Sequence, residues 1–122
     1  MRQPVRLPQP LTVIHGLLTF VVGWWSFILA LPGDTFATTP AMAAFGRVAT
    51  EEHWAAGLGI VCGCGVTGLR WQQCRTGSIY ILAFAHGMIS LTILFSNPIA
   101  TGAGTYGALM FCAWYLLAYD HV

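Results

Sequence analysis

The feature that most constrains this chain is a set of four apolar stretches that carry no charged side chain except Arg70. Each approaches the ~20 residues that a helix needs to cross ~30 Å of hydrocarbon. Charged residues make up only 7% of the 122 residues, too few to cover a soluble fold of this size. The sequence therefore predicts an all-α fold, a single membrane domain over residues 1–122 built as a polytopic transmembrane four-helix bundle. The predicted spans cover residues 11–31, 53–71, 77–96 and 99–119.

The first stretch also has features of a secretory signal peptide. Arg2 and Arg6 precede it, and small residues follow around Ala37. However, its apolar run is longer than the ~7–15 residues of a signal peptide, and it contains Trp24 and Trp25. We therefore interpret it as a span.

Basic residues predict the orientation in the membrane. With the N-terminus inside, only Arg47 lies outside, and the cytoplasmic arginines are Arg2, Arg6, Arg70 and Arg75. The expected location is the bacterial inner membrane, multi-pass, with both termini in the cytoplasm. Aromatic rings near the span ends are predicted interfacial anchors. These anchors are Trp54, Trp71, Trp114 and Tyr119.

The connections between spans also carry signals. The long outer loop, residues 32–52, contains Thr39-Pro40, which predicts the start of one short interfacial helix that runs through Ala49. Thr50 is the predicted N-cap of the second span, and Thr76 that of the third. The other loops are short, so consecutive spans are expected to be antiparallel neighbours.

Two spans carry small residues four positions apart, hence on one helix face. Such rows let helices approach closely in lipid. Parallel spans two and four could use one row inside the bundle and the other against a second copy, which predicts a homo-oligomer. The alternative is that both rows pack within one chain. The row of span two is Ala55, Gly59, Gly63 and Thr67, and that of span four is Ala100, Gly104, Ala108 and Cys112.

His86 is the strongly polar side chain nearest mid-membrane, and ionisable groups there are candidates for function. One interpretation is a neutral imidazole that bonds to a neighbouring helix; the other is a cofactor site. Haem held by two histidines is disfavoured, because His15 lies about four residues inside its span and His86 about nine, a depth difference of roughly 7 Å. No cofactor is therefore expected, with haem as the minor alternative.

No recognisable catalytic apparatus accompanies these features. The sequence shows no embedded carboxylate, no Ser/His/Asp set at plausible spacing and no phosphate-binding glycine loop, so we expect no enzyme activity. Cys62 and Cys64 are two residues apart and point to opposite sides of a helix, which argues against a metal site. The net charge of +1 offers no basic face for nucleic acid.

Two segments together carry a resemblance to a known group of proteins. They are the outer loop from Leu31 to Thr38, closed by Glu51-Glu52-His53-Trp54, and Ser96-Asn97-Pro98-Ile99-Ala100-Thr101-Gly102. In this order and spacing, the chain resembles small uncharacterised membrane proteins encoded by tailed bacteriophages and prophages. The resemblance implies a four-helix topology and a phage origin. Many holins, which permeabilise the inner membrane, end in a charged tail, and this chain has no basic cluster after Tyr119.

These observations favour a non-enzymatic membrane protein that acts through helix packing and self-association. The expected roles are a membrane lesion or channel, as in a holin-like protein, or exclusion of a second phage. The alternative is a structural or anchor subunit of a larger membrane complex with a cofactor near His86. A transporter for a small neutral solute also stays open.

Overall fold

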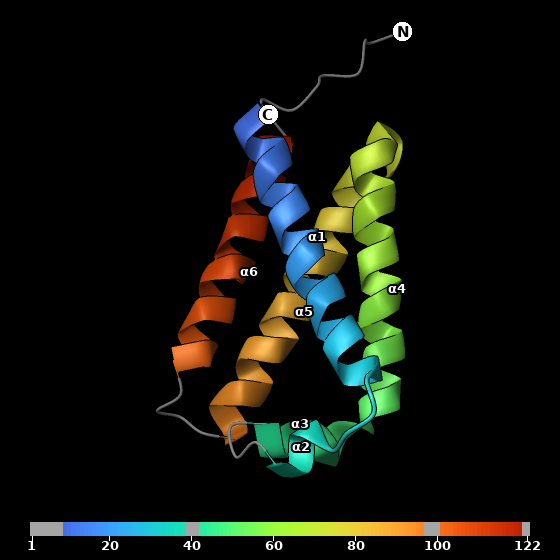
Figure 1. The fold of residues 1–122 in the computed structure, drawn as a ribbon. Helices are drawn as coiled ribbons and strands as arrows, with labels where there is room; N and C mark the ends of the chain where they lie inside the picture. The colour runs from blue at the N-terminus through green and yellow to red at the C-terminus, as the bar shows by residue number, and fades with distance from the viewer. Residues whose placement is uncertain (1–8, 39–41, 97–100, 121–122) are drawn as a thin grey trace, which may run out of the picture.

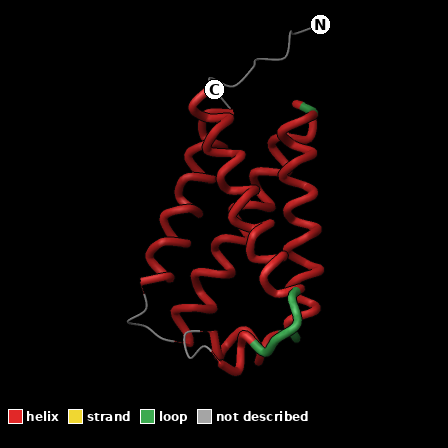
Figure 2. Tube along the Cα trace, viewed as in Figure 1, coloured by secondary structure: helices red, strands yellow, loops and turns green. Residues whose placement is uncertain are grey.

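The computed structural model describes residues 9–38, 42–96 and 101–120, and this part of the chain is helical with no strand (Figures 1 and 2). The predicted all-α class is confirmed. The long helices are α1 (Gln9–Ala30), α4 (Glu51–Arg70), α5 (Arg75–Ser96) and α6 (Thr101–Asp120). The short ones are α2 (Thr35–Thr38), α3 (Ala43–Val48) and the 3-10 turn η2 (Gln72–Cys74).

The four long helices lie lengthwise side by side, and α2 and α3 cross one end of them (Figure 1). We call that end the loop end, and the opposite end, which holds η2, the turn end. α1 packs mainly against α4, and α5 mainly against α6. α4 and α5 meet near η2 and diverge towards the loop end, so the interior widens in that direction.

Two helices, Pro10–Ala30 and Gln72–Ser96, are long and apolar enough to cross a membrane among the described residues. α4 and α6 have 20 residues each. α4 is less apolar because it carries Glu51, Glu52 and Arg70 at its ends and five glycines between them. Length and composition therefore single out α1 and α5.

The loop end differs from the single short helix that the sequence predicts. Two short helices, α2 and α3, replace it, and α3 begins after Met42. Thr39 and Pro40, on which the prediction rested, lie outside the described residues. The predicted cap of α4 is confirmed, because the Thr50 hydroxyl accepts a hydrogen bond from the His53 N–H at 3.3 Å.

The predicted cap of the third span is wrong. η2 leads directly into α5, whose first residue is Arg75, so Thr76 lies inside the first turn. An N-cap residue has non-helical backbone angles. Trp71, with φ −121° and ψ 117°, is the extended residue at which this turn begins. The helical segment thus begins at Gln72, four residues before the predicted cap at Thr76.

A cluster of aromatic rings fixes α2 and α3 to the bundle. Phe45 of α3 is fully buried, and its ring centroid lies 5.5 Å from that of Phe36, 5.1 Å from that of Trp54 and 5.6 Å from that of Trp25. The Trp54 indole N–H also donates to the Phe45 carbonyl at 2.9 Å. Aromatic rings bury large areas, so this cluster stabilises the loop end.

Candidate functional site

Two separate groups of polar side chains lie in the interior of the bundle. The first is at the turn end, where His15 Nε2 of α1 and Ser78 Oγ of α5 share a hydrogen bond of 3.2 Å. Thr19, one turn further along α1, donates to the His15 carbonyl at 2.9 Å. All three side chains are buried. The hydrogen bond between His15 and Ser78 therefore links α1 to α5, which are far apart in the sequence.

Two glycines of α4 make room for this group. A Cβ at Gly68 would overlap Ser78 and lie 3.2 Å from His15 Cε1. A Cβ at Gly65 would overlap the Thr19 side chain. The absence of side chains therefore lets α4 approach α1 and α5 closely at this level. Neither glycine was predicted as a contact residue, although their three-residue spacing places them on one helix face.

The second polar group surrounds His86 of α5, which is 0% exposed. Its Nδ1 lies 2.8 Å from the Leu82 carbonyl oxygen, an acceptor, so Nδ1 carries the proton. Its Nε2 is buried without a hydrogen-bond partner among the described residues. A deprotonated Nε2 is an acceptor, and buried acceptors without partners are rare. His86 Nε2 is thus a buried acceptor whose hydrogen-bonding capacity no described residue uses.

Tyr106 of α6 lies next to His86, with ring centroids 6.3 Å apart. The Trp25 indole N–H of α1 donates to the Tyr106 hydroxyl oxygen. Trp25 and Tyr106 also line a cavity of about 240 Å³ at the loop end. Its other lining residues are Trp24, Ile28, Leu29, Thr35 and Met42. These rings could not be connected to His86 from the sequence, since Trp25, His86 and Tyr106 come from three different helices.

The two buried histidines lie at different levels of the bundle. His15 bonds to Ser78, which precedes His86 by eight residues on α5, or roughly 12 Å along the helix axis. His53 is exposed at the start of α4, where its Nδ1 lies 2.6 Å from the Thr50 hydroxyl. Among the described residues, no group of three or more His, Cys, Asp or Glu could hold a metal ion.

The row of small residues in α4 is only partly covered. Ala55 is buried, and its carbonyl accepts from the Ser26 hydroxyl of α1 at 2.7 Å. A Cβ at Gly59 would lie 3.1 Å from Ser26 Oγ, whereas Gly63 has open space around it. Thr67 donates to the carbonyl of Gly63. Residues four positions apart on a helix are rotated by about 40° relative to each other. The row therefore turns away from α1 after Gly59.

The row in α6 faces outwards. Gly104, Ala108 and Cys112 are exposed, and a Cβ at Gly104 would meet nothing within 4 Å. Ala100 lies outside the described residues. α6 contacts α5 through other positions; for example, a Cβ at Gly87 of α5 would lie 2.9 Å from Met110 Sδ. No described helix therefore covers this part of the α6 row.

The four cysteines are free thiols, at positions 62, 64, 74 and 112. Cys62 serves in packing, since a Cβ at Gly23 of α1 would lie 2.8 Å from its Sγ. Cys64 lies two residues further along α4, on a different face of the helix. The two thiols thus do not form a shared site.

The predicted interfacial anchors have different surroundings. Trp54 is held under α3, as described above. Trp71 is 54% exposed at the turn end. Trp114 and Tyr119 of α6 are about half exposed, and Trp114 packs edge-on against Tyr80 of α5 with ring centroids 6.0 Å apart. Three of the four rings therefore present a large part of their surface outwards.

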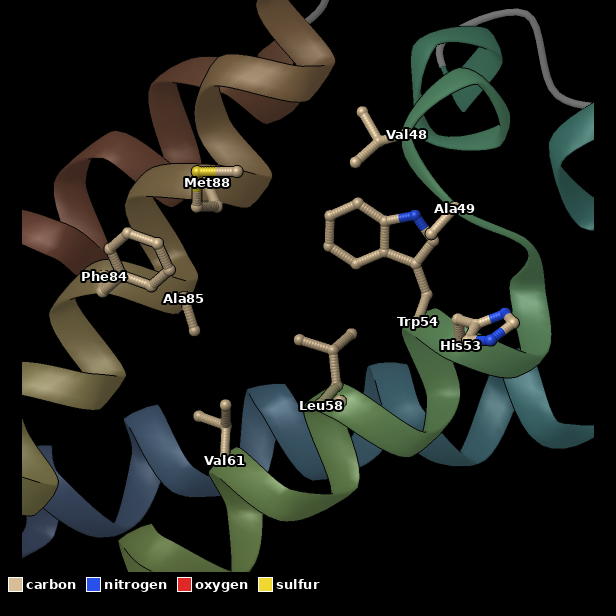
Figure 3. A pocket seen from close by; sticks show the side chains of 10 residues that line it. Val48, Ala49, His53, Trp54, Leu58, Val61, Phe84, Ala85 and Met88 are labelled. Carbon is tan, nitrogen blue, oxygen red and sulfur yellow. The ribbon is translucent and has the colours of Figure 1, made fainter.

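An open apolar groove separates α4 from α5 near the loop end (Figure 3). Its volume is about 280 Å³. Phe84, Ala85 and Met88 form the α5 wall, and Trp54, Leu58 and Val61 the α4 wall, while Val48 and Ala49 lie at its end. The groove follows from the divergence of the two helices.

Comparison of the chain with family models, with curated proteins and with solved structures produced no match.

Proposed function

We propose that this chain is a non-enzymatic protein of the bacterial inner membrane, with α1, α4, α5 and α6 as four spans and both termini in the cytoplasm. The outward apolar surface supports a membrane location. Each long helix exposes large apolar side chains, including Phe20 (64%), Ile60 (70%), Phe95 (80%) and Phe111 (69%). Contiguous exposed apolar surface marks a membrane or protein contact.

The charges fit the same arrangement. Glu51 and Glu52 stand at the loop-end start of α4, and Arg70 and Arg75 flank η2 at the turn end. Lys and Arg prefer the cytoplasmic side. The turn end then faces the cytoplasm, and α2 and α3 lie at the outer surface. In this arrangement, lipid rather than water surrounds the outward apolar surface of the bundle.

We further propose that two or more copies associate through the α6 row. The single observation that carries this proposal is the exposure of Gly104, Ala108 and Cys112 on a helix otherwise suited to close packing. The α4 row is less suitable, because α1 already contacts Ala55 and Gly59. Small residues on an uncovered face allow a second backbone to approach closely.

Oxidative crosslinking in membranes tests this contact. A variant that keeps Cys112 and replaces the other three cysteines should form a disulfide-linked dimer, because equivalent row positions meet across a two-fold axis. A variant that keeps Cys74 alone should not, since Cys74 lies in η2, away from the row. Non-reducing gels measure the linked fraction.

Glycine substitutions then identify the row. Gly104→Ile in the Cys112 variant should abolish the dimer, because the branched side chain blocks close approach. Gly77→Ile is the matched control, since Gly77 also has open space but lies on α5. Gly63→Ile tests, by the same dimer yield, whether the uncovered part of the α4 row contributes to the contact between copies. An unchanged dimer yield in Gly104→Ile would refute the contact.

The role proposed for the assembly is that of a phage-encoded membrane protein that forms a lesion or channel or excludes a second phage. The sequence resemblance supports the phage origin, and the exposed α6 row, through which copies could associate, supports action by occupying the membrane. Expression in a bacterial host tests the role, because killing indicates a lesion and protection from infection indicates exclusion. Gly104→Ile should lose either effect if assembly is required.

The second candidate function is a structural or anchor subunit of a membrane complex that holds a cofactor at His86. The buried Nε2 without a partner favours it, since histidine nitrogen is a haem ligand. A Soret band in the purified protein that disappears in His86→Ala would support this candidate over the first.

A further inference from the structure

The buried polar group around His86 carries an inference that is independent of self-association. His86 Nδ1 donates to its own helix at Leu82. The two nitrogens of an imidazole point in nearly opposite directions, so Nε2 points away from the α5 backbone. It is an acceptor that lacks a donor in the described structure. A buried acceptor of this kind is commonly satisfied by an ordered water.

Tyr106 supplies the matching donor. Its hydroxyl oxygen accepts the Trp25 N–H, and a phenol hydroxyl has one proton of its own to donate. Trp25 cannot accept that proton, because its indole nitrogen is a donor only. Tyr106 and His86 are neighbours whose ring centroids lie 6.3 Å apart. Polar groups that are close without a direct bond are often bridged by water.

The cavity at the loop end reaches one member of this pair, Tyr106, whereas His86 does not line it. Tyr106 and Trp25 line it together with Thr35 of α2 and Met42, which precedes α3. Its 240 Å³ volume holds several waters, at about 30 Å³ each. Thr35 and the Tyr106 hydroxyl offer hydrogen bonds to such waters, whereas the single Trp25 N–H is already donated to Tyr106. Leu29 and Ile28, which also line the cavity, are apolar and offer no hydrogen bonds to water.

We propose that a water molecule, supplied through the cavity lined by Trp25 and Tyr106, bridges the Tyr106 hydroxyl and His86 Nε2. The water accepts the Tyr106 proton in a hydrogen bond and donates one of its own to Nε2. This water and the Tyr106 hydroxyl thereby connect His86 Nε2 to the cavity that Tyr106 lines. The neighbouring titratable groups are Tyr106 itself and His15, the latter roughly 12 Å away at the level of Ser78.

Nitrogen-15 NMR of histidine-labelled protein in detergent micelles tests the site. His86 should show a protonated Nδ1, an unprotonated Nε2 and magnetisation transfer from water. The His86→Gln spectrum assigns these signals. Tyr106→Phe keeps the ring and removes the donor, so we expect the transfer from water to fall about three- to tenfold, as for loss of one hydrogen bond. His15→Gln, the matched control, should leave it unchanged.

A second pair of variants tests the route. Met42→Trp fills the cavity and should slow exchange with water by a similar factor, whereas Phe95→Trp, on an exposed part of α5, should not. A protonated Nε2, or no transfer from water in the wild type, would overturn the proposal. A Soret band lost in His86→Gln would also overturn it, because iron would then occupy the Nε2 position.

Discussion

At the turn end, α1, α4 and α5 meet through glycines and small polar side chains, whereas at the loop end large aromatic rings from α1, α3 and α4 pack together. Gly68 of α4 lies directly against Ser78 and His15. At the loop end, Phe45, Trp25 and Trp54 occupy the corresponding interior. Side-chain size thus changes from one end of the bundle to the other.

The difference accounts for the shape of the bundle. Helix axes approach closely where side chains are small and separate where they are large. α4 and α5 are joined by η2 at the turn end and diverge towards the rings (Figure 1). Both described apolar cavities lie in the widened part, one between α4 and α5 and one beside Tyr106. The bundle is therefore more open at the loop end than at the turn end.

The largest effect should come from the centre of the aromatic cluster. Phe45→Ala removes a fully buried ring and should lower the free energy of unfolding by about 3–5 kcal/mol. An SDS titration in mixed micelles measures it, and Trp fluorescence should shift to the red as Trp25 and Trp54 become wetter. Phe95→Ala is the control, since Phe95 is 80% exposed. Equal losses in the two variants would contradict the proposed importance of the cluster.

The next largest effect should come from the close approach at the turn end. Gly68→Val places a side chain where Ser78 already lies and should cost about 1–3 kcal/mol or more through overpacking. Gly63→Val, on the same helix with open space around it, should change stability little. The same titration measures both variants. If they were equally stable, the close contact at Gly68 would be disproved.

A smaller effect is expected from the polar contact between α1 and α5. Ser78→Ala removes the hydroxyl that bonds to His15 Nε2 and should cost about 1 kcal/mol. A double-mutant cycle with His15→Ala isolates the pair, with a coupling of roughly 0.6 kcal/mol expected inside a membrane. Additive single effects would mean that the bond contributes nothing to stability.

The smallest effect should come from the indole bond at the loop end. Trp54→Phe keeps an aromatic ring against Phe45 but removes the N–H that bonds to its carbonyl. That carbonyl also accepts from the Ala49 N–H, so it keeps a partner. We expect a loss of about 0.5 kcal/mol, at the low end for a hydrogen bond. A loss as large as that of Phe45→Ala would show that the bond, rather than ring packing, holds α3.

Several features of the fold were predictable because they depend on local sequence. The four long helices follow from apolar stretches bounded by polar residues, and the start of α4 follows from Thr50, whose hydroxyl satisfies a free N–H of the first turn. The start of α5 was not predictable in this way, since the 3-10 turn at Gln72–Cys74 replaces the usual cap. Short helices such as α2 and α3 depend on tertiary contacts with rings such as Phe45.

The candidate site was predicted only in its central residue. Hydropathy identified His86 as an unusual polar group, but its neighbours come from α1 and α6. Trp25 and Tyr106 are 81 residues apart in the sequence, and each alone resembles an ordinary aromatic residue of an apolar helix. No local pattern indicates that their side chains meet beside a histidine.

The sequence by itself determined the helical class, since long apolar segments with few charges satisfy their backbone hydrogen bonds most simply as helices. It also indicated two rows of small residues as candidates for packing, although it did not single out Gly65 and Gly68. Only the tertiary structure decided which row is covered, because that depends on how far each row turns around its helix relative to a neighbour. The same holds for His86, whose Nδ1 is satisfied within α5, while the surroundings of Nε2 depend on the helices that pack around it.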